Sequence, residues 1–170
     1  MIYQYPAQPT NLLMPIHSWD VVAGALREFF TSNARDAGLL ETFKDTFGWS
    51  LSNELRSKID KSKHDAIVLT DARQNILWVN DLFTQLTGYQ LNEALGRNPN
   101  FLQGKESDKI VTENIRDLLK KGESFTQTVL NFRKSGKPYH CCITVFPLYN
   151  QRNELVNYLA FEHEVDQDAA

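Results

Sequence analysis

Polar side chains that could bind a ligand gather in one short segment, residues 96–104, with the sequence Gly-Arg-Asn-Pro-Asn-Phe-Leu-Gln-Gly. Glycine at both ends and proline inside disfavour a regular helix or strand, so we expect a tight turn that buries its Phe and Leu side chains. The amides of Asn98 and Gln103 can both donate and accept hydrogen bonds there. They can contact a ligand, or they can close the turn by bonding to backbone groups.

Two further polar residues are candidates for ligand binding. Arg116 lies on a predicted helix, where it either holds an anion or faces solvent. Asn131 lies between Leu130 and Phe132 in a predicted strand. A buried amide needs a hydrogen-bond partner, so Asn131 indicates a ligand or a structural water.

The cysteines and histidines do not form a pattern typical of a metal site or a disulfide. Cys141 and Cys142 are adjacent and would point to opposite faces of a strand, so we expect them to be packing thiols. The four histidines lack metal-ligand spacing, and His163 is expected to lie in the core or at its rim. We therefore expect no metal.

Catalytic motifs are also absent from the sequence. There is no phosphate loop and no recognisable nucleophile–base arrangement. Glu162 and Glu164 share one face of the last predicted strand, and we expect both to point outward as solvated charges. The sequence predicts no enzyme.

The elements that must position these residues lie in residues 65–166 and predict an α+β fold. Helical segments include one capped by Asn80 and one that begins after Ser107 or Asp108 and ends at Gly122. Alternating or apolar runs predict five strands in an antiparallel sheet, with the helices on one face. These strands are expected near residues 66–70, 76–79, 124–133, 139–149 and 156–165.

An N-terminal extension precedes this domain. Residues 1–14 are expected to be an extended arm, and residues 15–64 a helical cap of amphipathic helices, one of them ending at Gly48. Residues 167–170 form a tail. The apolar stripes of the cap can cover the following domain or another subunit, so we expect a homodimer formed through the N-terminal helices and the sheet.

Composition excludes several classes of partner. A net charge of −3 and a pI near 5.8 indicate neither nucleic acid nor an anionic membrane as partner. No apolar run approaches the roughly 18 residues needed to span a bilayer, and the N-terminus does not have the pattern of a signal peptide. We expect a soluble, cytoplasmic protein.

The order of these elements resembles a PAS domain, and residues 96–104 resemble the GxNCRFLQG signature of its light-oxygen-voltage (LOV) subfamily. Smaller agreements are Leu-Thr-Gly-Tyr at residues 86–89 and Asn-Phe-Arg-Lys-Ser-Gly at residues 131–136. The resemblance implies a PAS fold, a role in signalling and FMN as a cofactor.

Four residues match positions that contact FMN in LOV domains. Asn98 and Gln103 match contacts to the flavin ring and to its phosphate-ribityl tail. Arg116 matches the second of two arginines that hold the phosphate, and Asn131 matches one of two asparagines at the polar edge of the ring.

Five residues depart from the family. Pro99 stands where LOV photoreceptors carry the cysteine that attacks flavin, so the adduct position is lost. Asn100 replaces the first phosphate arginine, and Cys141 replaces the second ring asparagine. His163 is aligned with the glutamine that relays the light signal. Phe161 is aligned with a glycine, where its ring would fill much of the flavin space.

Three functional hypotheses follow. The first is a sensory PAS module that cannot form the cysteinyl adduct and acts through dimer contacts or a downstream signalling protein. The second is a cysteine-less FMN protein that senses redox state or blue light. The third is a ligand-free PAS dimerisation module with Phe161 inside its core, which a Phe161→Gly variant that gains flavin would reveal.

Overall fold

The computed structural model describes residues 36–49, 52–61 and 65–166. The chain divides into two units, Met1–Thr46 and Phe47–Ala170, and the second unit contains every candidate site residue. The predicted arm, the first predicted helix of the cap and the C-terminal tail lie outside the described residues.

Two helices of the predicted cap are described. Helix α2 spans Asp36–Phe47 and is followed by Gly48 at φ +66°, a left-handed conformation that glycine adopts without steric cost. Helix α3 spans Asn53–Lys61, and the Ser52 hydroxyl accepts a hydrogen bond from the Leu55 backbone N–H at 3.1 Å, which caps its first turn.

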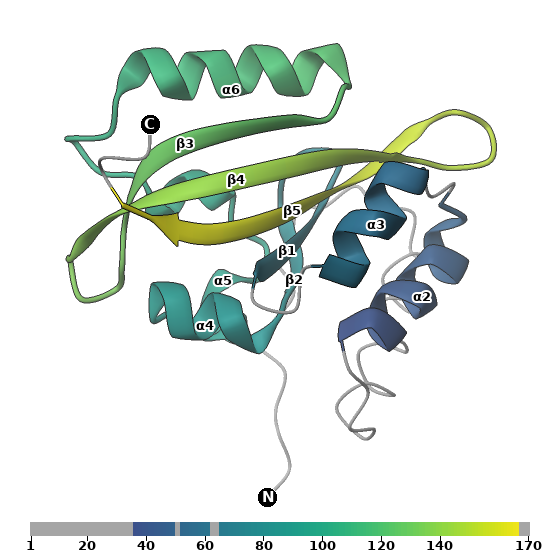
Figure 1. Cartoon of the computed structure of the whole chain (residues 1–170), viewed down its shortest axis with the longest axis horizontal. Coiled ribbons are helices and arrows are strands. Elements are labelled where there is room, and N and C mark those ends of the chain that lie inside the picture. Colours follow the sequence, from purple (N-terminus) through teal and green to yellow (C-terminus); the bar gives the residue numbers. More distant parts are fainter. Residues whose placement is uncertain (1–35, 50–51, 62–64, 167–170) are drawn as a thin grey trace, which may run out of the picture. The chain divides into compact units, whose positions relative to one another are not determined.

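Five strands form one antiparallel sheet in the order β2-β1-β5-β4-β3 (Figure 1). The predicted α+β class and five-stranded antiparallel sheet are therefore confirmed. Strand β5 lies between β1 and β4, so the last strand of the chain is central. The bounds are β1 Ala66–Asp71, β2 Ile76–Val79, β3 Phe125–Phe132, β4 Pro138–Tyr149 and β5 Leu155–Val165.

The helices between β2 and β3 begin and end at the residues that the sequence indicates. The Asn80 side chain accepts from the Phe83 backbone N–H at 3.1 Å, and Asp108 accepts from that of Ile110 at 2.8 Å. No helix in these described stretches combines the length and hydrophobicity needed to cross a membrane. The bounds are α4 Asp81–Thr87, α5 Leu91–Ala94, the 3₁₀ helix η1 Pro99–Leu102, and α6 Lys109–Lys121.

The strand register gives the sheet two distinct faces, because residues directly opposite one another on paired strands share a face. We call the face that packs against α4, α5, η1 and α6 the inner face, and the other the outer face. One row across the inner face is Val79, Val68, Ala160 and Val145. The adjacent row across the outer face is Trp78, Leu69, Leu159 and Phe146.

Candidate ligand-binding site

Helix α6 lies over β3 and β4 without burying its own apolar side. Its inward residues Val111 and Ile115 pack against Val129, Tyr139 and Cys141 of the inner face. Nevertheless, no residue of α6 is buried. An amphipathic helix on a sheet normally buries its apolar stripe more completely than α6 does.

Hydrogen bonds hold α6 in place at both ends. Before the helix, the Ser107 hydroxyl donates to the Leu130 carbonyl of β3 at 2.6 Å. At its other end, the Tyr158 hydroxyl donates to the Leu119 carbonyl at 3.2 Å, and the Tyr149 hydroxyl donates to that of Gly122 at 2.8 Å. The middle of α6 lacks such bonds, so its distance from the sheet is fixed by its two ends.

Buried polar groups line the inner face beneath this helix. Asn131 and Tyr139 are direct partners across β3 and β4, and both are buried. Burial raises the pKa of Tyr139, which the neighbouring Asn131 amide partly opposes. The Tyr139 hydroxyl nevertheless makes no hydrogen bond of standard geometry to any residue that the structure describes.

Cys141 and Glu162 complete this group. Cys141 has 0% exposure, and burial raises the pKa of its thiol, which therefore stays protonated. Glu162 on β5 is 5% exposed, and its Oε2 atom finds no hydrogen-bond partner among the described parts of the chain. Burial raises the pKa of Glu162 to about 7. At neutral pH it is thus a mixture of carboxyl and carboxylate.

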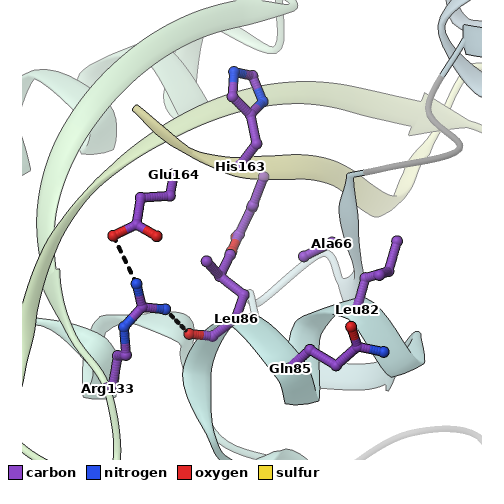
Figure 2. Close-up of a pocket in the computed structure, with 8 residues that line it drawn as sticks. Ala66, Leu82, Gln85, Leu86, Arg133, His163 and Glu164 are labelled. Atoms are coloured by element: carbon purple, nitrogen blue, oxygen red, sulfur yellow. Dashed lines mark hydrogen bonds and ion pairs between the residues drawn. The ribbon is translucent and has the colours of Figure 1, made fainter. Parts of the chain in front are cut away.

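A hollow of about 290 Å³ lies between α4 and β5 (Figure 2). Arg133 crosses it, pairing with Glu164 Oε1 at 2.6 Å and donating to the Leu86 carbonyl. Its guanidinium also lies over the Tyr139 ring, 4.5 Å from the ring centroid. The lining residues are Ala66, Leu82, Gln85, Leu86, Arg133, Glu162, His163 and Glu164.

A second hollow, of about 320 Å³, lies at the start of α6 and is suited to an anion. Lys105, Lys109 and Arg116 line it against one carboxylate, that of Glu113, and Arg116 forms no ion pair with any described residue. Sequence reasoning missed both lysines, although their closeness to Gly104 and to the helix start was a visible signal. The remaining lining residues are Gln103, Gly104, Ser107 and Thr112.

The turn at residues 96–104 depends on both of its glycines. Gly96 adopts φ +73°, and a Cβ atom added to Gly104 would lie 2.5 Å from the Phe132 ring. Asn98 caps η1 by accepting a hydrogen bond from the Asn100 backbone N–H at 3.0 Å. Of the two roles that the sequence allowed, ligand contact and turn closure, this bond is turn closure. Gln103 instead lies in the second hollow with Arg116.

Two predicted site residues lie on the opposite side of the sheet. Phe161 is on the outer face with 0% exposure, where it packs edge-on against Phe146 at 5.9 Å between ring centroids. The Lys58 ammonium of α3 lies 5.3 Å from its ring centroid. His163 points away from Arg133 and Leu86 (Figure 2), and its Nδ1 lies 3.4 Å from Asp65. The structure therefore places Phe161 and His163 on the outer face and not beneath α6, although His163 also lines the first hollow.

Their neighbours Ala160 and Glu162 occupy the inner face instead. Ala160 packs against the inner-face cluster that includes Val68 of β1 and Phe83 of α4, and Glu162 is paired with Ala66 and Ile143. The prediction that Glu162 points outward is wrong for the same reason, because a shift of one residue moves every side chain to the other face. Glu164 is half-exposed and paired with Arg133.

The candidate site therefore has two ends. At one end the inner face brings together Asn131, Cys141, Tyr139 and Glu162, and at the other the second hollow holds Gln103 and Arg116. Asn98 lies in the turn, where its amide nitrogen is 3.4 Å from the Gln74 side-chain oxygen. Among the described residues, no group of His, Cys, Asp or Glu is placed to hold a metal ion.

Comparison with known proteins gives consistent matches. A model of the PAS domain family matches residues 64–167. Phototropin-2 of Oryza sativa subsp. japonica is 31% identical over 119 residues, which are 69% of this chain and 13% of phototropin-2. The nitrogen fixation regulatory protein of Klebsiella oxytoca is 32% identical over 100 residues, 59% of this chain and 20% of that protein. This chain thus spans only a small part of these relatives.

A solved structure of a light-oxygen-voltage domain, studied with a flavin analogue, is similar in fold and sequence. It superimposes with a TM-score of 0.61 at 32% identity, covering 69% of this chain and 87% of that one.

Proposed function

This chain belongs to the PAS-domain family and to its LOV-like branch, and from that membership we propose that it is a sensory module that binds FMN between α6 and the inner face. The supporting observation is the incomplete packing beneath α6. The helix covers the sheet with no buried residue, while among the described residues Glu162 Oε2 has no hydrogen-bond partner and the buried Tyr139 hydroxyl has only the neighbouring Asn131 amide beside it. A ligand that is planar and apolar with a polar edge would satisfy both.

The residues present fit such a ligand. Asn131 and Tyr139 would bind the polar edge of the ring, while Val111 and Ile115 would contact its faces. Lys105, Lys109 and Arg116 would hold the phosphate, and the two lysines would compensate for the arginine that Asn100 replaces. When bound, FMN would supply absorption of blue light and the capacity to accept electrons.

The signal in this chain would not depend on a cysteinyl adduct. Pro99 stands at the family's cysteine position, and the Cys141 thiol is buried and protonated. Cys142 lies on the outer face, opposite His163. The reporting group beside the ligand would instead be Glu162, the inner-face residue next to the position that the family resemblance assigned to His163.

The output would pass through the sheet to the N-terminal helices, and from there to a second subunit or a downstream signalling protein. Helix α3 provides a connection, because Lys58 pairs with Asp65 at 2.6 Å at the start of β1 and contacts Phe161 of β5. The homodimer, the downstream partner and the cytoplasmic location remain predictions.

The test is flavin binding by the full chain, measured by the visible spectrum and by titration with FMN and with riboflavin, which lacks the phosphate. We expect Arg116→Gln to weaken FMN binding about tenfold and to leave riboflavin binding unchanged, because it removes one charge-assisted contact. Lys120→Gln, on the same helix but outside the second hollow, is the matched control and should change neither.

Two results would contradict the proposal. Protein that stays colourless with excess FMN would favour the ligand-free dimerisation module. Equal losses of FMN and riboflavin affinity in Arg116→Gln would remove the second hollow from the site.

A further inference from the structure

We propose that Arg133 is shared between two carboxylates, and that it transfers its ion pair from Glu164 to Glu162 when Glu162 loses its proton. The inference goes beyond the proposed function, since it requires no bound ligand. It would give the inner face a switch that responds to protonation.

The geometry brings the three groups to one hollow. Glu162 and Glu164 are two residues apart on β5, so their side chains leave the strand on the same face. Glu162 and Glu164 both line the hollow. Figure 2 shows Arg133 paired with Glu164 there. Arg133 now binds Glu164 at 2.6 Å and the Leu86 carbonyl, while Glu162 Oε2 has no partner among the residues described.

Few charged groups face Glu162. Its cross-strand neighbours Ala66 and Ile143 are apolar, and α4 contributes Leu82, Leu86 and the uncharged Gln85. The titratable groups nearby on β4 are Tyr139 and Cys141, and burial raises the pKa of each, so both stay neutral.

The other titratable group of the hollow, His163, has its ring on the outer face near Asp65. Arg133 is thus the one cation among the residues that line the hollow on the inner face, and Glu164 is the one competing anion.

The two carboxylates differ in what an unpaired charge would cost. Glu164 is half-exposed, so water can solvate its charge when Arg133 leaves. Glu162 is buried, and a buried carboxylate without a partner is strongly disfavoured. Burial raises its pKa to about 7, so the choice between partners would arise close to neutral pH. Ionised Glu162 should therefore replace Glu164 as the ion-pair partner of the Arg133 guanidinium.

The transfer would alter how the β3–β4 hairpin contacts α4. Arg133 bonds to the Leu86 carbonyl in the last turn of α4, and the next residue, Lys134, donates its backbone N–H to the Thr87 carbonyl at 2.8 Å. Lys134 also pairs with Glu93 at 2.5 Å. Moving Arg133 would change one of these adjoining contacts and leave those of Lys134 in place.

The experiment is an NMR titration of the full chain without ligand, following the Glu162 carboxyl carbon and the Arg133 side-chain nitrogens. We expect both to change with one midpoint near pH 7. Glu164→Gln should lower the Glu162 midpoint by about one pH unit, because it frees Arg133 and removes a like charge. In Glu162→Gln, the Arg133 signals should stop responding to pH between 6 and 8.

A double-mutant cycle separates the two effects of Glu164→Gln. In an Arg133→Gln background, the midpoint shift caused by Glu164→Gln should shrink to less than half. If Arg133→Gln does not fold, Arg133→Lys can replace it as the background. Because Arg133→Lys keeps the charge, the shift in the Glu162 midpoint caused by Glu164→Gln should persist in that background. A Glu162 midpoint near 4.5, Arg133 signals that ignore it, or an undiminished shift without Arg133 would each overturn the proposal.

Discussion

The two faces of the sheet are packed in different ways. On the outer face, Phe161 and Leu159 have no exposed surface and both ends of the buried Asn157 amide are hydrogen-bonded, while His163 Nδ1 has no hydrogen-bond partner among the described residues. Asn157 accepts from the Trp49 indole N–H at 2.9 Å and donates to the Thr70 carbonyl at 2.9 Å. On the inner face, the Tyr139 hydroxyl and Glu162 Oε2 find no partner in the described structure, and α6 buries none of its residues.

This difference indicates that the faces have different roles. Folding requires at least one well-packed core, and the outer face supplies it together with the inner-face residues that pack against α4, α5 and η1. Buried polar groups without partners reduce stability, so a chain that keeps them has a reason other than folding. The contrast between the faces therefore supports a ligand site on the inner face, independently of family membership.

The largest effect that tests this contrast should come from Phe161→Ala. We expect it to lower the free energy of unfolding by about 4 kcal/mol, because a fully buried aromatic ring leaves a cavity on a rigid face. Cys141→Ala, equally buried but beside the incompletely packed α6, should cost less than half as much. Urea denaturation measures both.

A third variant, Phe161→Gly, checks which face of the sheet the Phe161 side chain occupies. Phe161→Gly should not gain flavin binding, since its ring lies on the far side of the sheet from α6. Equal destabilisation by Phe161→Ala and Cys141→Ala would show that the two faces are packed alike.

The register of β5 marks where sequence reasoning failed. Most boundaries of the helices and strands could be predicted: Asn80 and Asp108 cap their helices, and β3 and β4 lie where the sequence predicts a pair of strands. In a hairpin, the short turn fixes which residues of the two strands are paired. Strand β5 is instead central and covered on both faces, so apolar residues occur at both parities and alternation cannot identify the inner one.

Other features depend on distances that no sequence pattern contains. The pairing of Arg133 with Glu164 joins two strands that are not neighbours in the chain, and hydrogen bonds at the two ends of α6 tie that helix to the sheet. Glu162 is buried because its cross-strand neighbours are the apolar residues Ala66 and Ile143. The prediction that its side chain points outward could not include this burial.

After the destabilisation by Phe161→Ala, the second-largest expected effect is a pH dependence of the free energy of unfolding that comes from Glu162. Folding raises its pKa from 4.5 to about 7, so the folded chain keeps a proton that the unfolded chain has released. The raised pKa of Glu162 stabilises the folded chain by up to about 3 kcal/mol in the free energy of unfolding. This stabilisation is fully present below pH 4.5 and is lost as the pH rises to 7. Capture of the carboxylate by Arg133 would reduce this loss.

Glu162→Gln removes the titration and should remove that slope, which denaturation curves between pH 4.5 and 8 would measure. Glu123→Gln, which changes an exposed carboxylate in the loop before β3, is the control and should keep the wild-type slope. If Glu162→Gln retained the full slope, the inner face would hold no buried titrating carboxyl.

The smallest effect should come from Ile115→Ala on the inward side of α6. Ile115 is only half-buried, so its truncation should cost about 1 kcal/mol or less in the free energy of unfolding without ligand. With saturating FMN the cost should grow, because a ligand that binds the folded state adds stability in proportion to the logarithm of its affinity. Ile110→Ala, 68% exposed on the same helix, should show neither effect. Thermal denaturation of both variants with and without FMN measures the difference, and a cost for Ile115→Ala that ignores FMN would place the ligand elsewhere than beneath α6.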